Sequence, residues 1–154
     1  MTGRSFLPLL RGTPFEPRRY VYSERGAHGD LHPVNSAEFD LARAIISRTH
    51  KLIYNATWQL PYVPVDFMGQ PFWTDIKERA RWGTLDPTFE RLLLAPTRPM
   101  IELYDLEKDP YEMTNLAGRP EVAELQHRLL LDLTEWMVQQ RDFVTLPVFQ
   151  RRNR

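Results

Sequence analysis

The apolar positions of this chain fall into short runs broken by glycine, proline and polar turns, and four of these runs predict β-strands. Residues 20–24 (YVYSE) are rich in strand-forming side chains and stop before two glycines. The runs at 42–47 (ARAIIS) and 51–56 (KLIYNA) flank a short polar turn, which predicts an antiparallel hairpin. A fourth strand is expected at 100–107 (MIELYDLE).

A different periodicity predicts a long helix over residues 120–140. Apolar side chains recur there at steps of three and four residues and form one stripe: Val122, Leu125, Leu129, Leu133 and Trp136. Burying one such side chain stabilises a fold by about 1.5–3 kcal/mol, so the stripe must face a sheet or another protein surface. Two shorter helices are expected at 73–82 and 86–94, where Asp86 before Pro87 is a typical N-cap and first turn.

Together these elements predict an α+β fold in a single domain of residues 1–154. We expect a small antiparallel sheet of about four strands, with the long C-terminal helix packed across one face. Residues 1–19 are interpreted as an extended lead-in with one short helical turn around 6–10. Residues 57–99 form a loop-rich insertion with short helices that wraps an edge of the sheet.

Composition narrows the possible functions. Twenty basic residues balance twenty acidic ones, which disfavours a general nucleic-acid binder. The chain has no cysteine, which excludes disulfides, thiolate metal sites and a cysteine nucleophile. No apolar run approaches the roughly 18 residues that a membrane-spanning helix needs, so no membrane span is expected.

The histidines raise a metal hypothesis. His28 and His32 are four residues apart, the spacing of two ligands on one helical face, and Asp30 lies between them. Nearby glycines and a proline disfavour a helix at this point, so a metal site is the less favoured interpretation. His50 and His127 are expected to be solvated surface residues.

Candidate ligand-binding residues gather in the segment 23–32 (SERGAHGDLH). No serine lies in a Gly-x-Ser-x-Gly elbow, and the chain has no glycine-rich phosphate loop. Glu24, Arg25 and His28 follow one another near the end of the first strand, where polar side chains can converge on a ligand. The alternative interpretation is an exposed polar loop without a ligand.

The run 102–118 (ELYDLEKDPYEMTNLAG) resembles the C-terminal signature of the formylglycine-dependent sulfatases, in the alkaline-phosphatase-like superfamily. The segment TGRSFLPLLRG is similar to the entry segment of that family, and EWMVQQRD is similar to its final helix. The order YSERGAHG then RAIISRTHKLIYN also resembles the family. The aromatic and proline-rich segment LIYNATWQLPYVPVDF resembles the heparan N-sulfatase (sulfamidase, N-sulfoglucosamine sulfohydrolase) branch.

The resemblance implies a piece of an enzyme. Complete members carry a Cys/Ser-x-Pro-x-Arg motif, modified to formylglycine, and a calcium ion in an N-terminal catalytic domain. This chain contains no such motif, so it resembles only the C-terminal subdomain and is expected to bind no cofactor and to hydrolyse nothing by itself. The implied partners are the catalytic domain and a sulfated sugar, and the parent enzyme is periplasmic or secreted if it follows its family. The particular sugar and the choice between O-sulfate and N-sulfate stay open.

The resemblance also implies roles for individual residues. His28 corresponds in order and context to a histidine that the family presents at the rim of the substrate pocket, with Glu24 and Arg25 nearby. These side chains are expected to recognise sugar hydroxyl or sulfate groups by hydrogen bonds.

Two further expectations concern surfaces and turns. Asp105, Asp109 and Asn115 are interpreted as turn-capping scaffold, because Asp and Asn side chains satisfy backbone groups in turns. An isolated subdomain should leave apolar side chains exposed and self-associate. The candidates are Phe6, Leu7, Leu9, Leu10, Trp58, Tyr62, Phe67, Phe72 and Trp73. The alternative function is a free-standing, non-catalytic binding or interaction module.

Overall fold

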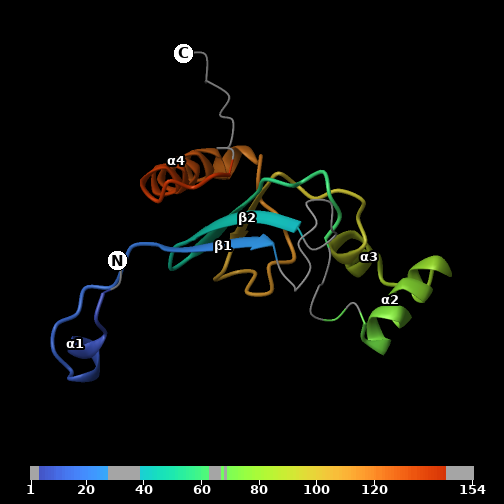
Figure 1. The fold of residues 1–154 in the computed structure, drawn as a ribbon, viewed down its shortest axis with the longest axis horizontal. Coiled ribbons are helices and arrows are strands. Elements are labelled where there is room, and N and C mark those ends of the chain that lie inside the picture. Colours follow the sequence, from blue (N-terminus) through green and yellow to red (C-terminus); the bar gives the residue numbers. More distant parts are fainter. Residues whose placement is uncertain (1–3, 28–38, 63–66, 68, 145–154) are drawn as a thin grey trace, which may run out of the picture.

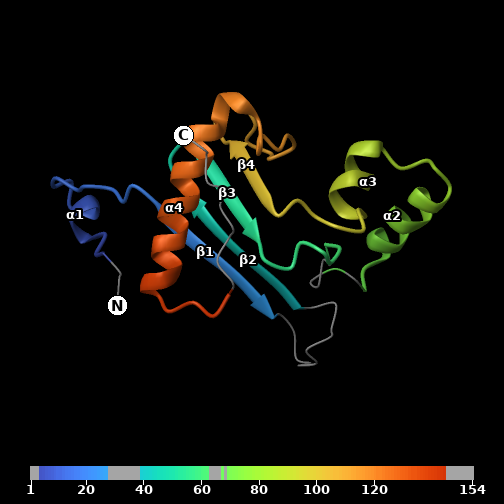
Figure 2. The same cartoon turned by 90° about the horizontal axis from the view of Figure 1, so that it is seen from above.

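A four-stranded antiparallel sheet forms the centre of the protein in this computed structural model, which describes residues 4–27, 39–62, 67 and 69–144. The strands are β1 (Val21–Ala27), β2 (Phe39–Ile46), β3 (His50–Asn55) and β4 (Ile101–Asp105). They lie side by side in chain order (Figure 2). The predicted hairpin is the β2–β3 pair, and the predicted sheet of four strands is confirmed.

The register of the strands produces two unlike faces. Ile45 of β2 lies opposite Leu52 of β3, and Leu52 lies opposite Leu103 of β4. All three side chains are fully buried. Because successive residues of a strand point to opposite faces, this apolar row defines one face as the core side and leaves the alternate positions for the other face.

The helix α4 (Ala123–Gln139) covers the apolar face, as the periodicity predicts (Figures 1 and 2). It follows a short 3₁₀ turn, η2 (Pro120–Val122). Leu129, Leu133 and Met137 are buried in the same cluster as the apolar row of the sheet. The other members of the predicted stripe, Val122, Leu125 and Trp136, are partly buried against it, and Leu130 is buried as well. The predicted α+β arrangement is therefore confirmed.

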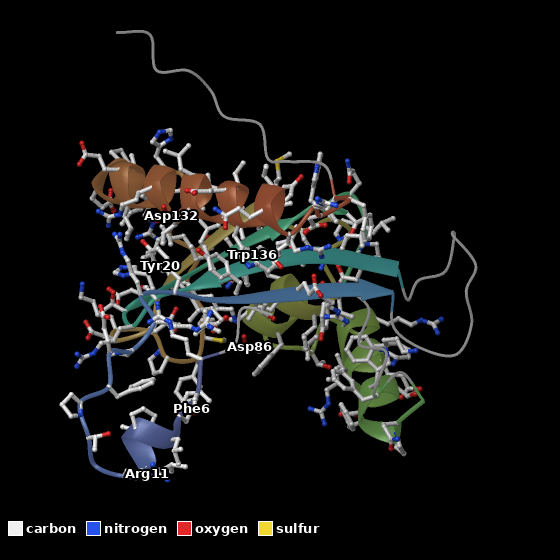
Figure 3. The ribbon with its side chains drawn as sticks, turned by 60° about the vertical axis from the view of Figure 1, so that its left-hand side comes forward. Phe6, Arg11, Tyr20, Asp86, Asp132 and Trp136 are labelled. Atoms are coloured by element: carbon white, nitrogen blue, oxygen red, sulfur yellow. The ribbon has the colours of Figure 1, made fainter. Side chains whose placement is uncertain are left out.

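The edge strand β1 is held to α4 by aromatic contact. The rings of Tyr22 and Trp136 stack with centroids 4.8 Å apart and an interplanar angle of 2°. Figure 3 shows Trp136 between the helix and the sheet. The rings of Tyr20 and Tyr22 pack edge-on with centroids 6.3 Å apart, so this row of aromatic contacts begins one residue before β1.

Three short helices lie away from this centre. The helix α1 (Leu7–Leu10) lies in the lead-in, apart from the sheet, while α2 (Pro71–Arg81) and α3 (Pro87–Leu93) lie beyond its other side (Figure 1). Asp86 caps α3 as predicted, because its carboxylate accepts a hydrogen bond of 2.8 Å from the Thr88 N–H. None of the helices in the described part of the chain has the length and apolar character needed to cross a bilayer.

The predicted exposure of apolar side chains is correct for the lead-in and wrong for Trp73. Phe6, Leu7, Leu9, Leu10 and Phe72 are exposed. Trp73, in contrast, is only 6% exposed. It packs edge-on against Phe67 with ring centroids 5.8 Å apart, so α2 buries its own tryptophan in a local aromatic cluster. Trp58, Tyr62 and Phe67 are half-buried.

Candidate functional site on the open face of the sheet

The face of the sheet opposite α4 is polar and borders a cavity of about 740 Å³. Arg25, Ala42 and Asn55 form one row across β1, β2 and β3. Ser23, Ala44, Ile53 and Glu102 form the next row, across all four strands. The alanines leave room above the centre of the sheet, and α3 with the loop that follows it supplies further lining residues: Arg91, Leu92, Ala95, Thr97 and Arg98.

Asp40 joins two arginines at one end of this cavity. It is buried, and its Oδ1 accepts a hydrogen bond of 2.6 Å from Arg98 Nη2. Its other oxygen lies 3.2 Å from Arg25 Nε, a charge–charge contact without hydrogen-bond geometry. The Arg98 backbone N–H also donates to Trp58 O at 2.9 Å, which fixes the loop that carries it. Asp40 therefore bridges two guanidinium groups at this end of the cavity.

A hydrogen-bonded chain of side chains forms the floor at the β3–β4 pair. Asn55 Nδ2 donates to Glu102 Oε1 at 2.6 Å and to Pro99 O at 2.8 Å. The Tyr104 hydroxyl donates to the second oxygen of Glu102. Burial, followed by the hydrogen bond and charge of Glu102, raises the pKa of Tyr104 well above its usual range. Tyr104 therefore stays a neutral donor, and both oxygens of Glu102 are occupied within the protein.

Basic side chains outnumber acidic ones along the cavity lining. Lys51 is paired with Glu112, its Nζ lying 2.9 Å and 2.7 Å from the two carboxylate oxygens. Arg25 stands over the ring of Tyr62, 5.6 Å from its centroid, and its side chain is 39% exposed. A partly exposed guanidinium beside an aromatic ring suits an anionic, hydroxyl-bearing ligand.

The structure separates the site residues predicted from the sequence. Arg25 lies in the cavity. Glu24 borders the cavity but lies opposite Arg43 in the register, so strand alternation directs its side chain to the other face from that of Arg25. His28 lies outside the described residues, so its place in the site stays a prediction.

Sequence reasoning missed Asp40, Arg98, Asn55 and the partnership of Glu102 with Tyr104. Asp40 and Arg98 are 58 residues apart, so no local spacing indicates that they meet. The signal for the other three was the strand pattern itself. Polar residues at alternate positions of β3 and β4 predict a second, polar face once the apolar face is assigned to the core.

Within the run 102–118, Asp105, Asp109 and Asn115 cap turns, as predicted. Asp105 Oδ1 accepts two backbone N–H groups at 3.1 Å, and these hydrogen bonds lower its pKa. Asp109 Oδ2 accepts from the Thr114 N–H at 2.7 Å. Asn115 Oδ1 accepts from the Leu103 N–H at 2.9 Å and so ties the loop back to β4. These three side chains close turns, and Asn115 also borders the cavity.

The metal hypothesis remains a prediction, because His28, Asp30 and His32 lie outside the described residues. Across the described ranges, no three His, Cys, Asp or Glu side chains gather closely enough to hold a metal ion. His127 is exposed on α4, as predicted. His50 is half-buried at the start of β3, where its Nδ1 lies 2.8 Å from Thr49 Oγ1.

This chain is similar to known sulfatases. No family model matches it. The chain is 32% identical over 145 residues to an ulvan-active sulfatase of Formosa agariphila, a match that covers 94% of this chain and 26% of that protein. It is 28% identical over 145 residues to the N-sulphoglucosamine sulphohydrolase of Homo sapiens, covering 92% of this chain and 27% of that protein.

The fold is also found within a solved sulfatase. A 2-O GAG sulfatase matches with a TM-score of 0.51 and 22% identity, covering 92% of this chain and 21% of that one. The chain thus spans about a quarter of the length of the curated relatives it matches. The sulfamidase branch is not singled out over the ulvan-active sulfatase. What these comparisons establish is that nearly all of this chain is similar to one region of sulfatases.

Proposed function

We propose that this chain is the C-terminal part of a sulfatase, where it packs on the catalytic domain and contributes residues to the rim of the pocket for a sulfated sugar. The observation that carries the proposal is the match to an ulvan-active sulfatase along 94% of the chain. The cavity on the open face of the sheet supports this proposal. Its lining contains basic side chains and hydrogen-bonding groups that can bind sugar hydroxyls, and it lies on the face that α4 does not cover.

Arg25 is the described residue best placed to meet the sugar. Its guanidinium is partly exposed, and the Asp40 carboxylate holds its orientation from one side. A guanidinium offers N–H groups in a planar fork that matches two oxygens of a sulfate group. Asp40 in turn is anchored by Arg98, so Arg98 acts as a positioning residue for Arg25.

His28 belongs to the same proposal on its sequence position alone. It directly follows the last residue of β1, and Arg25 lies on that strand. We propose that His28 donates a hydrogen bond to a sugar hydroxyl or sulfate oxygen at this end of the sheet. The strand register directs the Glu24 side chain to the opposite face from that of Arg25, so no contact with the sugar is assigned to Glu24.

Neither the sequence motifs of this chain nor the residues that the structure describes fit the formylglycine and calcium ion that the resemblance implies for the complete enzyme. The chain has no cysteine and no Ser-x-Pro-x-Arg motif. The described residues include no cluster of three acidic or histidine ligands. No hydrolytic step is therefore assigned to this chain, and its part in the reaction is binding and orientation of the sugar.

The test is sulfate release by an enzyme that joins this chain to the catalytic region encoded in the same reading frame. N-sulfoglucosamine and a sulfated ulvan oligosaccharide, assayed side by side, decide between the sulfamidase-like and the ulvan-like substrate. Arg25→Ala should raise KM about tenfold with little change in kcat, since it removes a charged hydrogen-bond donor from the rim. Arg79→Ala on α2 is the matched control and should leave KM within about twofold.

Two results would contradict the proposal. Sulfate release by the 154-residue chain alone would show that a nucleophile has been overlooked. A reading frame without a Cys/Ser-x-Pro-x-Arg region would favour the free-standing binding module instead.

We infer also that the exposed apolar side chains of the lead-in are part of the contact with the catalytic domain. Phe6, Leu7, Leu9 and Leu10 are exposed on an element that lies apart from the sheet (Figure 1). Exposed apolar patches of this kind tend to find partners. In the isolated chain the partner is a second copy.

A further inference from the structure

A second cavity, of about 550 Å³, lies at the other end of the sheet from Asp40 and is strongly basic. It is bordered by the end of the lead-in, the turn between β2 and β3, and the first half of α4. Five arginines line it: Arg4, Arg18, Arg19, Arg48 and Arg128. Glu16 is the acidic residue in the same lining.

The fold brings these arginines together from separate elements. Arg48 is carried by a tight turn, in which Ser47 Oγ accepts a hydrogen bond of 2.9 Å from the His50 N–H. Arg128 is carried by α4 next to Leu129, which is buried in the core and holds that turn of the helix against the sheet. Arg19 lies over the ring of Tyr20, 4.9 Å from its centroid. Arg48 and Arg128 are therefore held in place by the packed part of the fold.

The lining of this cavity contains more basic than acidic side chains. Arg4, Arg48 and Arg128 form no ion pair with any residue that the structure describes. Asp132 of α4 lies near Tyr20 (Figure 3). Burial, followed by the hydrogen bond to Asp132 and the negative charge of Asp132, raises the pKa of Tyr20. Over the whole chain the charges balance, so an excess of arginine in one concavity is a local feature that favours an anion.

We propose that this second cavity binds a sulfated saccharide chain through its sulfate groups. The inference rests on the proposed function and adds a binding site to it. Guanidinium groups match the paired oxygens of a sulfate. The half-buried Tyr20 lies in the same lining and offers apolar ring surface to the sugar. Because arginines approach from three elements, more than one sulfate of the same chain is contacted at once, which strengthens binding.

The test is a calorimetric titration of the 154-residue chain with a sulfated hexasaccharide. The desulfated hexasaccharide and a single-stranded DNA of equal charge are titrated in the same way as comparison ligands. The double variant Arg48→Ser, Arg128→Ser should bind the sulfated hexasaccharide about tenfold more weakly. The double variant Lys77→Ser, Arg81→Ser removes the same two charges from α2 and should stay within about twofold of the unmodified chain. Circular dichroism checks that both variants are folded.

A double lysine variant tests whether binding depends on the planar guanidinium groups or only on their positive charge. Arg48→Lys with Arg128→Lys keeps both charges but removes the planar fork, so affinity should recover only in part. Binding of the desulfated hexasaccharide with equal affinity, or equal losses in the serine and α2 variants, would overturn the proposal. Tighter binding of the DNA than of the sulfated hexasaccharide would replace it with a nucleic-acid site.

The outcome is separable from that of the proposed function. In the complete enzyme, Arg48→Ser with Arg128→Ser should leave sulfate release from a monosaccharide substrate unchanged, because these arginines lie at the other end of the sheet from Arg25. If the complete enzyme releases sulfate but the 154-residue chain does not bind the hexasaccharide, only the second site is overturned. If the complete enzyme releases no sulfate but the chain binds the hexasaccharide, only the proposed function is overturned.

Discussion

Arg43 is a charged residue on the apolar side of the sheet. It lies on β2 two positions before Ile45, and its side chain is 3% exposed. Its Nε and Nη2 contact the two oxygens of Asp142 at 2.5 Å and 2.9 Å, while Nη1 donates to the backbone oxygens of Arg25 and Ala42. This guanidinium therefore ties the segment after α4 to two strands of the sheet.

Removing the carboxylate partner of Arg43 should strongly destabilise the fold. Asp142→Ala leaves a buried guanidinium without its countercharge, which typically costs about 3–5 kcal/mol in the free energy of unfolding. The matched control is Asp75→Ala, which breaks the exposed pair with Arg79 and should cost at most about 0.5 kcal/mol. Urea unfolding of the three proteins measures both values. Equal stability of the Asp142 and Asp75 variants would contradict the assigned role.

The same pair predicts an acid dependence of stability. The hydrogen bond from Arg43 lowers the pKa of Asp142 below its usual value, which is about 3.9 in an unfolded chain. A lowered folded-state pKa means that this stabilisation is present above about pH 4 and is lost as the pH falls through the folded-state pKa. The difference in unfolding free energy between the unmodified chain and Asp142→Ala should thus shrink in acid. Urea titrations at neutral and acidic pH measure it, and a constant difference would refute the linkage.

At the scale of elements, β4 and the loop after it form one hydrogen-bonded unit. Asn115 occupies its centre. Its Oδ1 accepts from the N–H groups of Leu103 and Ala117, each at 2.9 Å, and its Nδ2 donates to Ile101 O at 3.2 Å. The loop leads directly into η2 and α4, so these bonds fix where the helix begins relative to the sheet.

Asn115→Ala should therefore cost more than an ordinary surface substitution. It leaves backbone groups of β4 without partners, and the expected loss is about 2–3 kcal/mol in the free energy of unfolding. Thr114→Ala is the neighbouring control, because the Thr114 side chain is exposed, and it should change stability by less than about 0.5 kcal/mol. Thermal and urea unfolding measure both, and a loss for Thr114→Ala as large as that for Asn115→Ala would argue against the scaffold role.

At the scale of the whole molecule, α4 covers one face of the sheet (Figures 1 and 2), and the other face is polar and borders the first cavity. The first cavity extends along this second face, and the second cavity lies at the end of the sheet away from Asp40. The lead-in extends away from this body with an exposed apolar surface. A sheet covered on one face only, with an apolar arm beside it, is a shape that suits contact with a larger domain.

The isolated chain should self-associate through the lead-in. Leu7→Ser with Leu10→Ser removes two exposed leucines from α1 and should shift the molecular mass measured by light scattering toward that of a monomer. Leu60→Ser with Phe89→Ser removes exposed apolar side chains elsewhere and is the control. A chain that stays monomeric at high concentration, or equal effects of the two double variants, would contradict this prediction.

The sequence by itself determined the secondary structure and the layering. The patterns that predicted them are local: strand-forming runs, the three- and four-residue steps of the stripe on α4, and Asp86 before Pro87. Each depends only on residues that are close together along the chain. They located all four strands and α4 within a few residues. Asp105, Asp109 and Asn115 were interpretable for the same reason, because each caps a turn within its own segment or beside it.

Only the tertiary structure decided the site. Asp40 meets Arg98 across 58 residues, and the strand register places Glu24 and Arg25 on opposite faces. The arginines of the second cavity come from three elements that no short pattern connects. Trp73 is buried because Phe67 packs against it in space. Local periodicity indicates which side of an element is apolar. Which charged side chains come together depends on how segments that are distant in the sequence pack, and that packing is a property of the whole fold.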